Sequence, residues 1–180
     1  QMIAEPVLQL LVLQVGLPLA LIVFNAFVPA SSAMGLLARF IAIGALLSYL
    51  ALAGVWLFPP SWAASLMGFL HIGGTLILIV RYCQNQHTRV PWRKWAERVI
   101  AGTAAVIVFA VLGLAIAARV TPQGAIDLAP PLEPGRYLVV SGGNSPGLNA
   151  HLSTLHDTRF RAVRGQSFAV DLIGVDQLGF

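Results

Sequence analysis

The stretch Val99–Arg119, VIAGTAAVIVFAVLGLAIAAR, decides the fold of this chain. It carries no charge before its last residue, and it is as long as a helix that crosses the bilayer core, which needs about 20 apolar residues. Directly after it the sequence changes to VTPQG at residues 120–124, where proline and glycine favour a turn. We therefore expect the surroundings of the chain to change from lipid to water near residue 119.

The composition supports this division. Hydrophobic residues make up 57% of the chain and charged residues only 10%, with a mean hydropathy of +0.79, whereas soluble domains carry about 25% charged residues. Residues 1–118 contain only two acids, while residues 119–180 contain five acids and five arginines. The first part therefore has the composition of a membrane domain.

Three more apolar stretches precede this one, at about residues 6–28, 36–58 and 62–82. Backbone groups in lipid must pair internally, so we expect four helices, with a kink at Pro18. The expected fold class is a membrane all-α anchor of four transmembrane helices, followed by the start of a β-rich extracytoplasmic domain. Its domains are a transmembrane anchor at 1–118, a proline-rich linker at 119–135 and a domain that begins at 136–180.

The basic residues predict the orientation of the chain in the lipid bilayer. Arg39 follows the first stretch, and Glu97 is the only acid among the bases between the third and fourth stretches, which are Arg81, Arg89, Arg93, Lys94 and Arg98. Short loops rich in bases stay in the cytoplasm, so residues 119–180 are expected on the far side of a cytoplasmic membrane. We assign the net charge of +4 to this topology and not to nucleic-acid binding, because the bases do not form a stripe with interleaved aromatic residues like that of single-strand binders.

Three of the polar residues within the expected spans are singled out: Gln14, Asn25 and His71. His71 is a functional candidate, because ionisable groups at membrane depth are rare. The alternative is a neutral imidazole bonded to a neighbouring helix, and the lack of Asp, Glu or Lys within the expected spans favours it. Gln14 and Asn25 are interpreted as interhelical hydrogen-bonding residues.

Two short runs in the last part of the chain predict β-strands. Residues 136–141, RYLVVS, precede a Gly-rich turn, and residues 167–173, SFAVDLI, lie between two glycines. The candidate metal ligands there are His151 and Asp171, with His156 next to Asp157 as a further pair. Zinc sites in hydrolases combine imidazoles with a carboxylate, but a surface histidine and an unrelated aspartate would give the same pattern. The single cysteine, Cys83, excludes an internal disulfide and a multi-cysteine zinc site.

Residues 135–180 resemble the start of the catalytic domain of membrane-attached bacterial lysostaphin-like (LytM-like) zinc metallopeptidases, peptidase family M-twenty-three. The resemblance is carried by YLVVSGG at 137–143, LNAHLSTL at 148–155 and FRAVRGQSFAVDL at 160–172. It implies a β-rich fold that hydrolyses peptides of cell-wall peptidoglycan. It also implies a zinc ion held by a histidine, an aspartate that follows it, and the second histidine of a later His-x-His pair. Asp171 matches the aspartate, and His151 is then the first ligand.

The chain departs from the family pattern at two points. Many members place the first histidine four residues before the aspartate, where this chain has Ser167, so the segment between His151 and Asp171 must loop out. The His-x-His pair is absent, and both ends of the chain look cut, so we expect further zinc ligands beyond Phe180 and no catalytic residue within the fragment itself.

Three functions follow as hypotheses. The first is the N-terminal fragment, itself inactive, of a membrane-anchored zinc metalloendopeptidase. It would lie in the bacterial inner membrane, with a periplasmic domain acting on peptidoglycan peptides. The second is a non-catalytic membrane protein with a degenerate, peptidase-like binding domain. The third is a small transporter or sensor centred on His71.

Overall fold

The computed structural model describes residues 4–54, 56, 59–84, 91–121, 123–124, 132–145 and 148–179. The chain divides into two compact units, Gln1–Gly54 with Trp62–Leu112, and Val55–Ser61 with Gly113–Phe180. The described residues include four helical stretches long and apolar enough to cross a membrane: Leu8–Phe27, Ala33–Ala53, Trp62–Gln84 and Lys94–Ala117. The four expected apolar helices are therefore confirmed among the described residues, and they are consistent with a multi-pass membrane protein.

The first span consists of three helical segments in direct succession. Helix α1 covers Ala4–Leu11, a π-helical turn η1 covers Val12–Gly16, and α2 covers Leu17–Phe27. The Leu17 N–H bonds to the Val12 carbonyl, five residues back, and Pro18 is the second residue of α2. Because proline has no N–H to donate, the regular α-helical pattern cannot pass through it. The helix accommodates Pro18 with a π turn.

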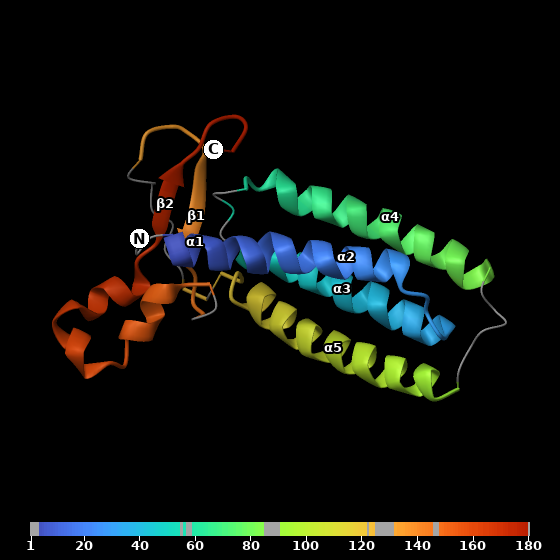
Figure 1. Ribbon diagram of the computed structural model, residues 1–180. Coiled ribbons are helices and arrows are strands. Elements are labelled where there is room, and N and C mark those ends of the chain that lie inside the picture. The colour runs from blue at the N-terminus through green and yellow to red at the C-terminus, as the bar shows by residue number, and fades with distance from the viewer. Residues whose placement is uncertain are drawn as a thin grey trace. The chain divides into compact units, whose positions relative to one another are not determined.

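The other three spans are single α-helices (Figure 1), α3 at Ala33–Ala53, α4 at Trp62–Gln84 and α5 at Pro91–Ala117. The Ser32 hydroxyl caps the start of α3 by accepting from the Gly35 N–H. Helix α3 ends at Ala53, earlier than the expected stretch to residue 58, and residues 57 and 58 lie outside the described part of the chain.

The core of the first unit lies between α2, α3 and α4. Its buried side chains are Ile22, Ile43, Leu47 and Met67. Helix α4 approaches α2 closely at Gly74, where a Cβ atom would lie 3.4 Å from the Ile22 carbonyl oxygen. Large apolar side chains on the outer surface are exposed, among them those of Phe69, Ile100 and Val106. Such an outer surface is typical of helices solvated by lipid.

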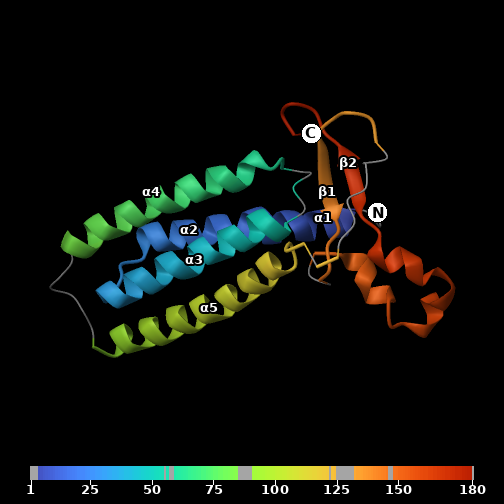
Figure 2. The ribbon, with the colours of Figure 1, turned by 180° about the vertical axis from the view of Figure 1, so that it is seen from behind.

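The second unit contains a two-stranded antiparallel sheet (Figure 2), made of β1 at Tyr137–Ser141 and β2 at Asp171–Gly174. Tyr137 pairs with Gly174 and Ser141 with Asp171, with an irregularity between Val139 and Ser141. Two 3₁₀ segments separate the strands, η3 at Ala150–Thr154 and η4 at Thr158–Phe168.

This unit differs from the sequence prediction in its second strand. The strand expected over residues 167–173 begins only at Asp171, so this aspartate opens the strand and does not lie near its end. Ser167 and Phe168 belong to η4. The described part of the unit therefore has two short strands, and a larger β-rich domain stays a prediction. Of the expected linker, Pro122 and residues 125–131 lie outside the described residues.

Candidate functional site

The side chain of Asn149 connects the separate segments of the second unit. It is 1% exposed, and its Oδ1 accepts hydrogen bonds from the Ser141 hydroxyl at 3.3 Å and from the His151 N–H at 3.0 Å. Its Nδ2 donates to the carbonyls of Gly143 and Ala169, both at 3.2 Å. One buried amide thus joins the end of β1, the start of η3 and the residues just before β2.

This connection brings together the two residues that the sequence singled out as metal ligands. His151 Nε2 lies 2.9 Å from Asp171 Oδ2, although 20 residues separate them in the chain. Their side chains are 36% and 52% exposed, so both are open to an incoming ligand. His151 is held by Asn149 at the N-terminus of η3, and Asp171 is held opposite Ser141 in the sheet.

Ser167, which lies four residues before Asp171, is fully buried. Its hydroxyl lies 2.8 Å from the hydroxyl of Thr154, and its carbonyl faces the Asn149 amide. Ser167 is therefore part of the framework, and the 3₁₀ segment η4 forms the loop that lets His151 reach Asp171.

The 2.9 Å contact is a hydrogen bond from the His151 Nε2–H to the Asp171 carboxylate, so a zinc ion would have to replace the proton on Nε2 to be held by both side chains. Zinc bonds of about 2.0–2.2 Å in a tetrahedral arrangement place neighbouring ligand atoms about 3.3 Å apart, so the 2.9 Å pair would have to open by a few tenths of an ångström. An imidazole nitrogen and a carboxylate oxygen are the donor types that zinc hydrolases use. Within the described residues, however, no group of three or more His, Cys, Asp or Glu side chains could hold a metal.

In the second candidate pair, His156 and Asp157, the carboxylate of Asp157 is bound by Arg159. The Asp157 carboxylate caps η4 by accepting from the Arg159 N–H at 2.9 Å, and the Arg159 guanidinium binds the same carboxylate at 2.6 Å. The guanidinium, and then the backbone N–H, hold the pKa of Asp157 below its ordinary value. Asp157 is therefore a helix cap paired with an arginine.

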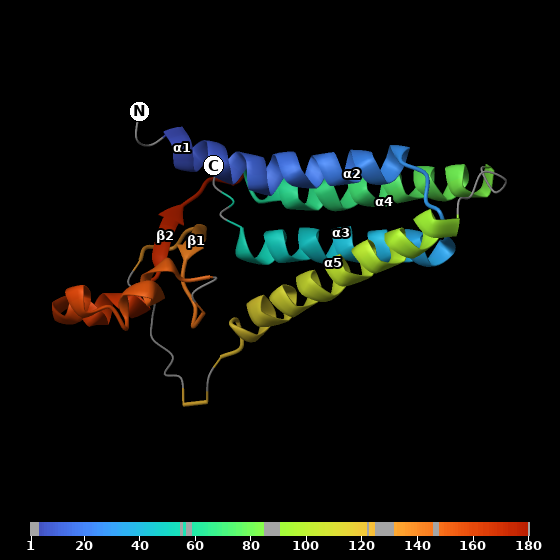
Figure 3. The same cartoon turned by 60° about the horizontal axis from the view of Figure 1, so that its bottom comes forward.

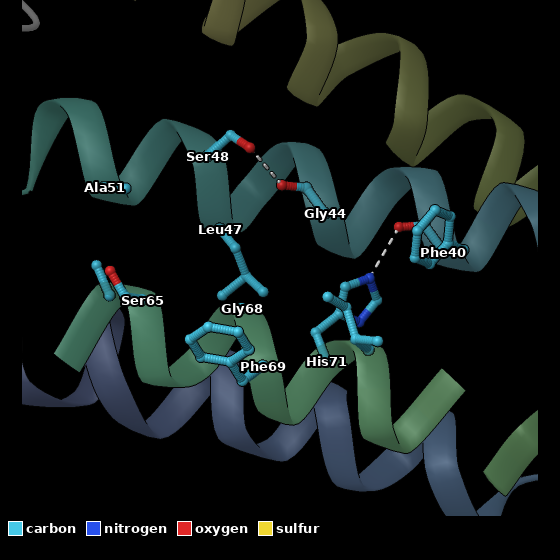
Figure 4. Close-up of a pocket in the computed structure, with 11 residues that line it drawn as sticks. Phe40, Gly44, Leu47, Ser48, Ala51, Ser65, Gly68, Phe69 and His71 are labelled. Atoms are coloured by element: carbon cyan, nitrogen blue, oxygen red, sulfur yellow. Dashed lines mark hydrogen bonds between the residues drawn. The ribbon is translucent and has the colours of Figure 1, made fainter. Parts of the chain in front are cut away.

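His71 lies beside a cavity of about 430 Å³ between α3 and α4 (Figure 4). Its Nε2 is 3.1 Å from the Phe40 carbonyl of α3, and its ring stacks on the Phe40 ring with centroids 5.1 Å apart. Asn25 likewise donates to the Thr75 hydroxyl at 3.1 Å and so joins α2 to α4. The predicted interhelical hydrogen bonds of His71 and Asn25 are confirmed, and Gln14 is buried.

A buried polar cluster in the first unit is not predicted by the sequence pattern. Glu97 was placed in a basic loop, but it lies in α5, forms an ion pair with Arg39 of α3, and accepts from the Ser31 N–H at 2.7 Å. Gly35 leaves room for it, since a Cβ atom there would lie 2.5 Å from Glu97 Cδ. A single acid among five bases was the available signal, because a buried arginine needs a carboxylate partner.

Comparisons of this chain with models of protein families, with curated proteins and with solved structures find no match. The resemblance to lysostaphin-like peptidases therefore stays a prediction that depends on the residues quoted above.

Proposed function

We propose that this chain is the membrane-anchored, N-terminal portion of an extracytoplasmic zinc metalloendopeptidase that acts on peptidoglycan peptides. The observation that carries the proposal is the 2.9 Å contact between His151 Nε2 and Asp171 Oδ2. The sequence resemblance singled out these two residues as ligands, and the intervening loop that it required is present as η3 and η4.

In this proposal the residues of the chain position and orient the ligands. Asn149 fixes the backbone of His151, while the pairing of Ser141 with Asp171 fixes the start of β2. Zinc, when bound, supplies Lewis acidity toward a peptide carbonyl and a nearby water molecule. Two ligands do not complete a catalytic site, which uses three protein ligands, so the proposal requires at least one more ligand from a continuation of the chain.

The described residues contain no group of three or more potential metal ligands, which favours a second function. In this alternative the second unit is a degenerate, non-catalytic domain that binds cell-wall peptides. The transporter or sensor hypothesis has less support, because the His71 contacts recorded here are those of a structural residue.

Zinc content and peptide release distinguish these functions. The natural protein that carries this chain would be purified, its zinc measured by elemental analysis, and its release of peptides from peptidoglycan assayed. We expect one zinc per chain, with loss of zinc and activity in His151→Ala and Asp171→Asn. His156→Ala is the matched control, because His156 is an exposed histidine of the same unit outside the pair. Zinc well below one per chain in the unmodified protein, without peptide release, would support the non-catalytic alternative.

A further inference from the structure

One end of the helix bundle collects basic residues, and among the described residues only Arg39 of this group has an acidic partner. The ends of α2 and α4 and the starts of α3 and α5 lie together there (Figures 1 and 3). Arg81 belongs to the last turn of α4, and Lys94 and Arg98 lie one turn apart on α5. All three lie close to the ends of candidate spans, the depth at which lipid headgroups begin.

The one acid that could neutralise this end is already engaged. Glu97 lies between Lys94 and Arg98 in sequence, but its carboxylate is buried against Arg39 and the Ser31 N–H. Arg39 is also held by the Val28 carbonyl at 2.8 Å and stacks over the Phe24 ring at 5.0 Å. Arg39 and Glu97 therefore neutralise each other's charge.

The shallower cations have no acidic partner among the described residues. Arg81 lies 5.8 Å from the centre of the Phe27 ring. Arg98 donates from Nε to the Ser32 hydroxyl at 3.3 Å, which orients the guanidinium and leaves its two terminal nitrogens available. Like charges one helical turn apart repel each other, so an anion between Lys94 and Arg98 would relieve that repulsion.

We propose that Lys94 and Arg98 form a binding site for the phosphate of an anionic phospholipid. The two terminal nitrogens of a guanidinium match two phosphate oxygens, and a lysine adds a point charge. Because both residues lie at the start of a candidate span, at the depth of the lipid headgroups, the phosphate of a lipid is favoured over a soluble anion.

Competition between two lipids tests the proposal. The full chain, purified in a neutral detergent, would be mixed with equal amounts of phosphatidylglycerol and phosphatidylcholine with identical acyl chains, and the bound lipids counted by native mass spectrometry. We expect a preference for phosphatidylglycerol. Each cation near a membrane surface strengthens anionic-lipid binding by about fivefold, so Lys94→Gln with Arg98→Gln should reduce the preference by about twenty-five-fold.

The matched control removes the same charge elsewhere. Arg161→Gln with Arg164→Gln changes two exposed arginines of the second unit and should keep the preference. The charge-conserving pair Lys94→Arg with Arg98→Lys should also keep most of it, which excludes misfolding as the cause of any loss. The proposal is wrong if the first pair retains the preference, if the control pair loses it equally, or if inorganic phosphate displaces the lipid.

Discussion

At the scale of single residues, the buried amide of Asn149 determines the geometry of the candidate site. Its five polar neighbours belong to three segments of the chain. The sequence could nominate His151 and Asp171, because metal ligands are chemically distinctive. It could not nominate Asn149, because an asparagine in a Gly-rich region is equally typical of an exposed turn. Its role depends on contacts between residues far apart in sequence.

Replacing Asn149 with alanine should therefore destabilise the second unit strongly. The change leaves buried partners without a hydrogen bond, and we expect a loss of about 1–3 kcal/mol in the free energy of unfolding. Hydrogen exchange of the β1 and β2 amides in the full chain measures it. Ser153→Ala is the control, because it removes a side-chain hydrogen bond to the Ala150 carbonyl at an exposed position. It should lower the free energy of unfolding far less than Asn149→Ala does. Equal effects of both changes would contradict the role of Asn149.

The pairing of Asp157 with Arg159 gives a pH dependence. Because the folded state lowers the pKa of Asp157 below the ordinary 3.8, the carboxylate stabilises the fold above that value. This contribution is lost as the pH falls through the lower pKa of the folded state. Arg159→Gln should raise the pKa of Asp157 toward 3.8, and Arg161→Gln should leave it unchanged. An NMR titration of the Asp157 carboxyl carbon measures both, and a pKa insensitive to Arg159→Gln would contradict the assignment.

At the scale of helices and strands, hydrophobic length predicted the spans well and their ends less well. Four apolar stretches were expected, and the described part of the chain contains four suitable helices. The helix ends depend on local capping and on tertiary contacts. Helix α3 stops at Ala53 although apolar residues continue, and α5 starts at Pro91, several residues before the expected Val99. The earlier start places Glu97 within a helix, facing Arg39, and no hydropathy pattern could reveal that pairing.

The contacts of the buried Glu97 join α5 to α3, and they predict the effect of a larger residue at Gly35. Gly35→Ala should place a methyl group in the space of the Glu97 carboxyl and destabilise the first unit by about 1–3 kcal/mol. Gly102→Ala is the control, because a Cβ atom there meets nothing within 4 Å. It should be neutral or stabilising by up to about 1 kcal/mol, since alanine favours helices. Thermal unfolding in detergent compares the two, and a neutral Gly35→Ala would show that Glu97 is not tightly enclosed.

At the scale of the whole molecule, the account depends on which side of the membrane each part of the chain occupies. The basic residues predict that α4 ends in the cytoplasm, where Cys83, an exposed free cysteine, lies in the last turn. They predict that residues 119–180 lie on the opposite side. Hydropathy predicts that the chain passes from lipid to water near residue 119. It does not predict on which side of the membrane residues 119–180 lie. That prediction depends on the basic residues and is tested in cells.

Cysteine labelling tests this topology. An impermeant maleimide should label Ser153→Cys, introduced in a Cys83→Ser background, in intact spheroplasts. Cys83 of the unmodified chain should react only after the membrane is permeabilised. Ser153 is exposed, so poor accessibility within the folded unit would not explain a negative result. Labelling of Cys83 but not of Ser153→Cys in intact spheroplasts would place the second unit in the cytoplasm and contradict the extracytoplasmic peptidase.

The most direct measurement of the central claim is an NMR titration of the natural protein that carries this chain, labelled with ¹⁵N-histidine, against zinc, because the proposal requires a ligand beyond these two. We predict that the Nε2 resonance of His151 shifts on zinc addition, that the resonances of His156 and His71 stay in place, and that Asp171→Asn abolishes the His151 shift. A His151 resonance that does not respond to zinc, or that responds equally in Asp171→Asn, would contradict the claim that these two residues bind one metal ion.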